Sequence, residues 1–138
     1  MDRDTKPLNT QGRNHFALNL QVVYVAGAPT FVEGDKASAS AQSGSYVSLV
    51  QTGAGVLTVT TINPFPGFVR AKANLFMVTP NGNSLAPITG KATQNANGTW
   101  SVAISTAVNA AGTHTATTPA NGDGFGIELV LRNSASLP

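Results

Sequence analysis

Apolar side chains occupy every second position in several short stretches of the chain. The alternation is found in residues 16–25, 46–51, 56–62, 68–78, 99–106 and 124–132. A period of two is typical of a strand that buries one face, and no window of eleven residues keeps the period of a helix. The pattern predicts an all-β protein. Its expected core includes Trp100, Val102 and Ile104 in one strand, and Phe125, Ile127, Leu129 and Leu131 in another.

Turn-forming residues separate these stretches. Asn-Gly pairs at 81–82, 97–98 and 121–122 tolerate positive φ at both central positions, as a type I′ turn requires. The Gly-x-Gly step within residues 52–55 would hold phosphate only if it led into a helix. Residues 56–62 are mostly β-branched, so we interpret this step as a hairpin turn. Residues 27–45 are rich in turn formers and small residues, and we expect a long loop there.

Seven or eight short strands with frequent turns predict one antiparallel two-sheet β-sandwich, jelly-roll-like, over residues 16–138. A small closed barrel is the alternative. In the strand at 68–78 we expect one alternating set to face inward, either Val69, Ala71, Ala73, Leu75 and Met77 or their neighbours. Residues 1–15 carry five charged side chains and little apolar content, so we expect an extended N-terminal arm that orders on a partner or stays mobile.

Charge is sparse and unevenly distributed. The chain has 8 basic and 6 acidic residues, a net charge of +2, and none of them lies within 37–69 or 92–122. Nucleic-acid binding needs clustered Lys and Arg, so this distribution argues against it. The absence of cysteine excludes disulfides and Cys-based metal sites. We expect neither an export signal nor a membrane-spanning segment, because no apolar run is long enough for either.

Few side chains are suited to catalysis or cofactor binding. His15 and His114, the only histidines, fall in segments that we expect to be solvated, and no Gly-x-Ser-x-Gly motif occurs. We therefore expect neither an enzyme nor a bound cofactor or metal. Glu33, Asp35 and Asp123 could contribute to a cation site, but turn chemistry explains all three without a metal.

Two groups of residues are candidates for an interface. Phe65 and Phe68 flank a proline at a predicted strand connection, where they either close the core locally or contact a partner. Arg70 and Lys72 alternate outward on their strand, as Glu128 does on the last strand, close to Arg132. These charges either form cross-strand ion pairs on a solvated sheet face or contact a neighbouring subunit.

Two longer stretches carry a family resemblance: GSYVSLVQTGAGVLTVTTINPF at 44–65 and NGDGFGIELVLR at 121–132. Together they resemble small jelly-roll or immunoglobulin-like β-sandwich proteins of tailed phage virions, the capsid decoration or cement proteins. In that pattern a Thr-Gly-x-Gly turn, here residues 52–55, opens an alternating strand. An Asp-Gly-Phe step, here residues 123–125, opens the final strand. The same turn-and-strand pattern also recurs in trimeric C1q-like heads and fibre tips.

The resemblance implies a homotrimer, made in the host cytoplasm, that sits on the capsid surface of the virion and clamps the major capsid protein without catalysis. Arg3, Lys6 and Arg13 of the arm would supply charged contacts across that interface. The alternative is a receptor- or carbohydrate-binding tip of a tail fibre, which should expose aromatic rings. Tyr24, Tyr46 and Trp100 are the candidate rings, and all three lie in predicted strands. A small hydrolase has least support, because no acid, base and nucleophile converge in the sequence.

Overall fold

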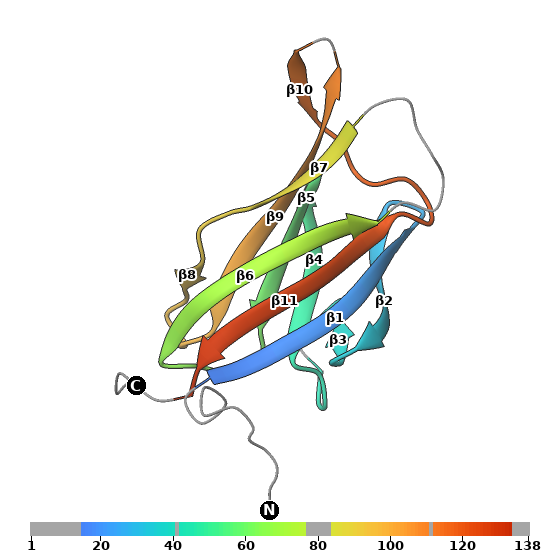
Figure 1. The fold of residues 1–138 in the computed structure, drawn as a ribbon. Coiled ribbons are helices and arrows are strands. Elements are labelled where there is room, and N and C mark those ends of the chain that lie inside the picture. Colours follow the sequence, from blue (N-terminus) through green and yellow to red (C-terminus); the bar gives the residue numbers. More distant parts are fainter. Residues whose placement is uncertain (1–14, 41, 77–83, 111, 134–138) are drawn as a thin grey trace, which may run out of the picture.

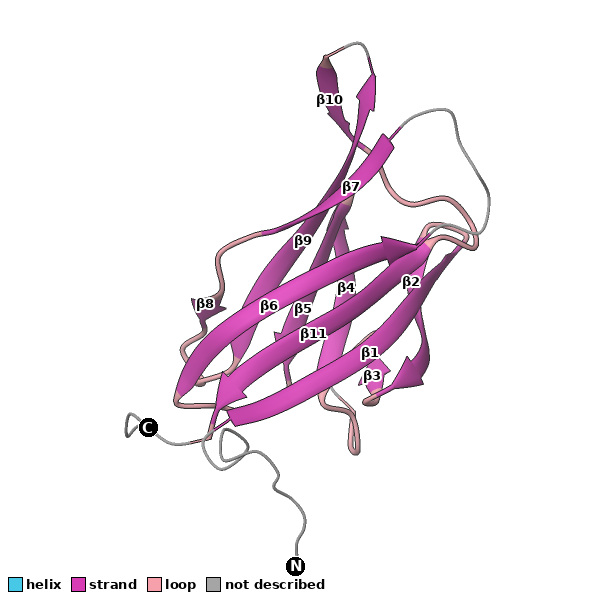
Figure 2. Ribbon diagram, viewed as in Figure 1, coloured by secondary structure: helices cyan, strands magenta, loops and turns pink. Residues whose placement is uncertain are grey.

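The computed structural model describes residues 15–40, 42–76, 84–110 and 112–133. Within these ranges the chain consists of strands and their connections, with no helix (Figure 2). It follows that the described ranges contain no helix with the length and hydropathy of a membrane span.

Two sheets pack face to face (Figure 1). Sheet A has the strand order β2-β1-β11-β6, with β1 at His15–Val25, β2 at Ala28–Gly34, β6 at Gly67–Phe76 and β11 at Gly124–Arg132. Sheet B has the order β10-β9-β5-β4-β3, with β3 at Ala37–Ser38, β4 at Val47–Gly53, β5 at Val56–Thr61, β9 at Trp100–Ala110 and β10 at Thr113–Ala116. Two further strands, β7 at Ser84–Thr89 and β8 at Thr93–Gln94, also pair with β9. Apart from the short parallel pair β3–β4, all pairs are antiparallel, which confirms the predicted two-sheet β-sandwich.

The core lies between the sheets. In sheet A the inward residues of β1 pair with those of β11 in the register Leu18↔Leu129, Leu20↔Ile127 and Val22↔Phe125. Sheet B contributes Val47, Leu49, Leu57, Val59, Val102 and Ile104, which are buried. The predicted core sets are therefore confirmed except for one residue, Trp100. It is only partly buried, because it begins β9 at the end of the sandwich.

The prediction of a long loop at residues 27–45 is wrong, because this segment contains β2 and β3. Ala26 (φ 53°) and Gly27 (φ 81°) supply the positive φ values of a two-residue turn, so β1 and β2 form a hairpin. Within the described ranges β2 pairs only with β1, so it is an edge strand, and most of its residues are exposed. It therefore lacks the alternation that reveals the other strands.

Two further strands, β6 and β9, differ from the prediction. A register shift in the β11–β6 pairing places Phe68 opposite Leu131 and Arg70 opposite Val130, so Val69 is an extra residue and is 38% exposed. Ala71 and Ala73 face the core as expected, and Met77 lies outside the described residues. The strand predicted to end at 106 continues to Ala110 and forms a hairpin with β10. His114 thus belongs to a strand rather than to a loop.

The predicted turns form, but with different geometry. Residues 52–55 connect β4 to β5 as a hairpin, with Gly55 at φ 69°. At Asn97-Gly98 and Asn121-Gly122 only the glycine has positive φ, so neither is the expected type I′ turn. The Asn97 side chain instead accepts hydrogen bonds from the backbone and the hydroxyl of Thr99. The pair at 81–82 lies outside the described residues.

Candidate interaction surfaces

Five aromatic side chains gather at the end of the sandwich where β1 and β9 begin. Phe65 stacks on Phe16 with ring centroids 5.6 Å apart, and Tyr46 lies 6.0 Å from Phe16. Phe68 lies 5.7 Å from Trp100, whose indole N–H donates to the carbonyl of Phe65 at 2.9 Å. Phe65 and Phe68 therefore pack against the core and close it locally. Their contact with a partner stays a prediction.

The candidate charges on sheet A come together across β6 and β11. Arg70 and Lys72 are 58% and 63% exposed, and their side-chain nitrogens lie 3.7 Å and 3.8 Å from the same Glu128 carboxylate oxygen. Exposed pairs of this kind contribute about 0–1 kcal/mol each, so they can exchange partners at low cost. The arm candidates Arg3, Lys6 and Arg13 lie outside the described residues.

The acidic candidates for a cation site have structural positions. The Asp35 carboxylate accepts the backbone N–H of Asn19 at 2.7 Å, and the Asp35 N–H donates to the Asn19 carbonyl at 2.8 Å. Asp123 is buried in the turn before β11, where its carbonyl accepts the N–H of Tyr24 at 2.8 Å. Glu33 is exposed on β2. In the described part of the chain, no three His, Cys, Asp or Glu side chains form a group that could hold a metal ion.

A polar bridge that the sequence pattern does not reveal links the two sheets. The hydroxyl of Tyr24, on β1, donates to the Gln51 side-chain oxygen on β4 at 2.7 Å, and the Gln51 amide donates to the Gly53 carbonyl at 2.8 Å. Burial raises the pKa of Tyr24 to about 12, because it disfavours the charged phenolate. Alternation marks both residues as inward-facing, but only the packing of the sheets shows that they meet.

The strands of sheet B contain no Asp, Glu, Lys or Arg. Lys91 lies in the connection between β7 and β8, next to Gly90, whose N–H donates to the Ala103 carbonyl. Pairing registers align the outward residues of sheet B in rows, such as Ser48–Thr60–Ser101 and Val50–Thr58–Ala103. We call this surface the Thr/Ser face; its members are Ser48, Val50, Thr58, Thr60, Ile88, Ser101, Ala103 and Ser105. Among them Val50 and Ile88 are 44% and 61% exposed.

Three hydroxyls of the Thr/Ser face, those of Thr58, Thr60 and Ser101, are paired. Thr60 and Ser101 lie 2.9 Å apart, and Thr58 lies 2.9 Å from Thr52, which is near the end of β4. The Asn95 amide adds a bond to the Ser101 hydroxyl at 3.0 Å. A partner that covers these groups need not replace hydrogen bonds to water one by one, so the face is suited to packing against protein.

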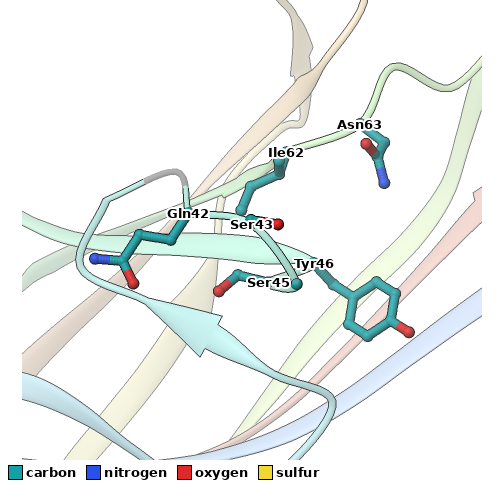
Figure 3. A pocket seen from close by; sticks show the side chains of 7 residues that line it. Gln42, Ser43, Ser45, Tyr46, Ile62 and Asn63 are labelled. Carbon is teal, nitrogen blue, oxygen red and sulfur yellow. The ribbon is translucent and has the colours of Figure 1, made fainter.

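An open groove lies between the β3–β4 and β5–β6 connections (Figure 3). Its volume is about 490 Å³, and we call it the Tyr46 groove; it is lined by Gln42, Ser43, Gly44, Ser45, Tyr46, Ile62 and Asn63. The Ser45 N–H donates to the Gln42 carbonyl at 3.1 Å, which closes a turn with Gly44 at φ 84°. Sequence reasoning missed the groove because its lining comes from two connections without periodicity.

The described residues thus form three candidate contact surfaces. These are a charged ladder on sheet A, made of Arg70, Lys72 and Glu128, the Thr/Ser face on sheet B, and the Tyr46 groove at one end. The ladder consists of sequence candidates and the groove contains one, Tyr46, whereas the Thr/Ser face emerges only from strand pairing. Comparisons of the chain with protein-family models, with curated proteins and with solved structures give no match.

Proposed function

We propose that this chain is a structural virion protein, a decoration protein that binds the major capsid protein on the outer surface of a phage head as a homotrimer. The observation that carries the proposal is a difference between the two sheets. Sheet B presents the uncharged Thr/Ser face, whereas sheet A presents the charged ladder. The resemblance of residues 44–65 and 121–132 to decoration proteins supports the same function.

The energetic argument concerns desolvation. A charge buried at an interface must be paired well or it opposes binding, and the Thr/Ser face presents no charge to bury. Val50 and Ile88 add apolar area that water would leave on contact. The charged ladder on the other sheet faces solvent, where it helps to keep the particle surface hydrated.

The dimensions of the face fit part of a specific interface. β4, β5 and β7 have 7, 6 and 6 residues, which at roughly 3.3 Å each span about 20–23 Å. With β9 they make four paired strands, which at roughly 4.8 Å each are about 19 Å wide and give about 400 Å². A standard interface buries about 800 Å² on each partner. One face of sheet B therefore supplies about half of the area required, and we propose that the arm at residues 1–14 supplies more.

The test places one charge on each sheet. Val50→Lys puts an ammonium on the Thr/Ser face, whereas Val32→Lys, at a residue that is 55% exposed on β2, is the matched control. We expect Val50→Lys to lower co-sedimentation with capsids that lack the protein by at least about tenfold, because the charge loses water without gaining a partner. Val32→Lys should bind like the wild type, and both variants should keep the melting temperature.

Equal capsid binding by the two lysine variants would contradict docking through the Thr/Ser face. Absence of capsid binding by the unaltered protein would contradict the decoration function itself.

A second candidate function, a carbohydrate-binding tip of a tail fibre, is favoured by one observation. Of the three candidate rings, Tyr24 is buried and Trp100 uses its N–H within the protein, but Tyr46 is 40% exposed beside a groove. Sugar rings commonly stack on exposed aromatic side chains, so Tyr46 supports the carbohydrate-binding alternative.

A further inference from the structure

We propose that the Tyr46 groove binds a neutral sugar ring. The inference deepens the second candidate function and does not depend on capsid docking. It rests on three properties of the groove: an aromatic ring held in place, polar side chains without partners, and a lining without charge.

The aromatic ring is held by its backbone and by a neighbouring ring. The Tyr46 N–H donates to the Lys36 carbonyl at 2.8 Å, and the Tyr46 carbonyl accepts the Ile62 N–H at 2.9 Å. The ring contacts Phe16 at 6.0 Å and still leaves the residue 40% exposed. A ring fixed in this way offers an apolar face to the C–H groups of a pyranose without losing conformational entropy on binding.

The polar groups that line the groove suit hydroxyl recognition. Figure 3 shows Gln42 toward one end of the groove, Asn63 and the Tyr46 ring toward the other, and Ser43 and Ser45 between them. The side chains of Gln42, Ser43 and Asn63 make no hydrogen bond with another described residue. Carboxamides and hydroxyls both donate and accept, which matches the two-way hydrogen bonding of sugar hydroxyls.

Ser45 is a second, independent indication of a polar ligand. Its side-chain oxygen is buried and has no hydrogen-bond partner among the described residues, and the residue is only 6% exposed. Buried hydroxyls are almost always paired in folded proteins. Because Ser45 lines the groove, a small rotation about its side-chain bond would let a ligand hydroxyl provide the missing partner.

The charge of the groove favours a neutral ligand. None of its seven lining residues is charged. The Lys36 ammonium lies at its edge, 3.8 Å from the position that a Cβ on Gly44 would occupy, and does not line the groove. An acidic sugar would gain only a solvent-screened attraction from this one exposed ammonium, so recognition does not require a carboxylate and neutral glycosides should bind.

The experiment is a titration of the full chain, labelled with ¹⁵N, with methyl glucoside, methyl galactoside, methyl mannoside and methyl N-acetylglucosaminide, and with glucuronate as the acidic probe. At least one neutral glycoside should give saturable shifts confined to the backbone amides of residues 42–46 and 62–63 and the side-chain amides of Gln42 and Asn63.

Tyr46→Ala should weaken that binding about tenfold, whereas Tyr46→Phe should retain most of it. Asn63→Ala should weaken it about fivefold. Asn74→Ala, a matched change at an exposed amide on β6, should leave it unchanged.

Three results would overturn the proposal: no saturable shift with any neutral glycoside, saturable shifts elsewhere in the chain, or equal binding by Tyr46→Ala. Binding of glucuronate alone would contradict the neutral ligand class. The capsid co-sedimentation of Tyr46→Ala should equal that of the unaltered protein. The sugar proposal and the docking proposal can therefore fail separately.

Discussion

Replacement of Tyr24 by Phe removes the hydroxyl by which β1 bonds to the Gln51 side chain on β4. Tyr24 is 1% exposed, and its hydroxyl donates to the Gln51 oxygen at 2.7 Å. The ring of the Tyr24→Phe variant should keep its contact with Phe125, whose centroid lies 6.0 Å away. The change therefore tests the hydrogen bond with little change in packing, and near neutral pH we expect it to lower the free energy of unfolding by about 1 kcal/mol.

The sign of this effect should reverse at high pH. Burial raises the pKa of Tyr24 from its ordinary value of 10.0 to about 12. Below pH 10 both folded and unfolded chains keep the phenol proton, so the hydroxyl contributes its full stability. Between about pH 10 and 12 the unfolded chain loses the proton first, and each pH unit lowers the free energy of unfolding by about 1.4 kcal/mol. Above the pKa of the folded state the wild type has thus lost about 3 kcal/mol that Tyr24→Phe keeps, and the two stability curves should cross between pH 10 and 12.

The assay is urea unfolding of both proteins at a series of pH values from neutral to strongly alkaline. All other ionisable groups are the same in the two proteins, so the difference between the two free energies isolates Tyr24. A difference that stays constant over the alkaline range would refute the burial argument. A variant that is as stable as the wild type at neutral pH would refute the contribution of the bridge.

Three other predictions follow from the core, a turn and the arm. Ile104→Ala or Leu129→Ala should lower the free energy of unfolding by about 2–5 kcal/mol in chemical denaturation, because both side chains are fully enclosed; a loss below about 0.5 kcal/mol would contradict their inward position. Gly55→Ala should cost about 2 kcal/mol or more, since φ is 69° and the added Cβ would lie 2.6 Å from the Thr106 carbonyl oxygen, and an unchanged melting temperature would contradict that geometry. Deletion of residues 1–14 should leave the melting temperature unchanged but reduce capsid co-sedimentation, with a partial salt dependence; equal capsid binding by both forms would remove the arm from the interface.

The sequence predicts the central strands well because their large side chains alternate. In β11 every second residue enters the core, namely Phe125, Ile127, Leu129 and Leu131. This period can be recognised in the sequence without knowledge of the partner strand. Edge strands lack the signal. The residues of β2 are mostly exposed, and its hairpin turn is Ala-Gly rather than Asn-Gly, so nothing local marks it as a strand.

The candidate surfaces were less predictable, because they depend on strand neighbours. Alternation placed Arg70, Lys72 and Glu128 outward, and the pairing of β11 with β6 then brought them together. The extra residue Val69 could not be foreseen, since a bulge depends on both strands of a pair. The Tyr46 groove forms where the β3–β4 and β5–β6 connections come together, and no local sequence pattern predicts that these two segments are neighbours.

The central claim is that the chain docks on a capsid through the uncharged face of sheet B. Electron cryomicroscopy of a virion that carries the chain tests this most directly. We expect a β-sandwich in threefold arrangement on the outer surface of the head, with the Thr/Ser face against the major capsid protein and the Arg70–Glu128–Lys72 ladder toward solvent. Density for the chain at the end of a tail fibre, or a head-bound sandwich that turns its charged ladder toward the capsid, would contradict the account.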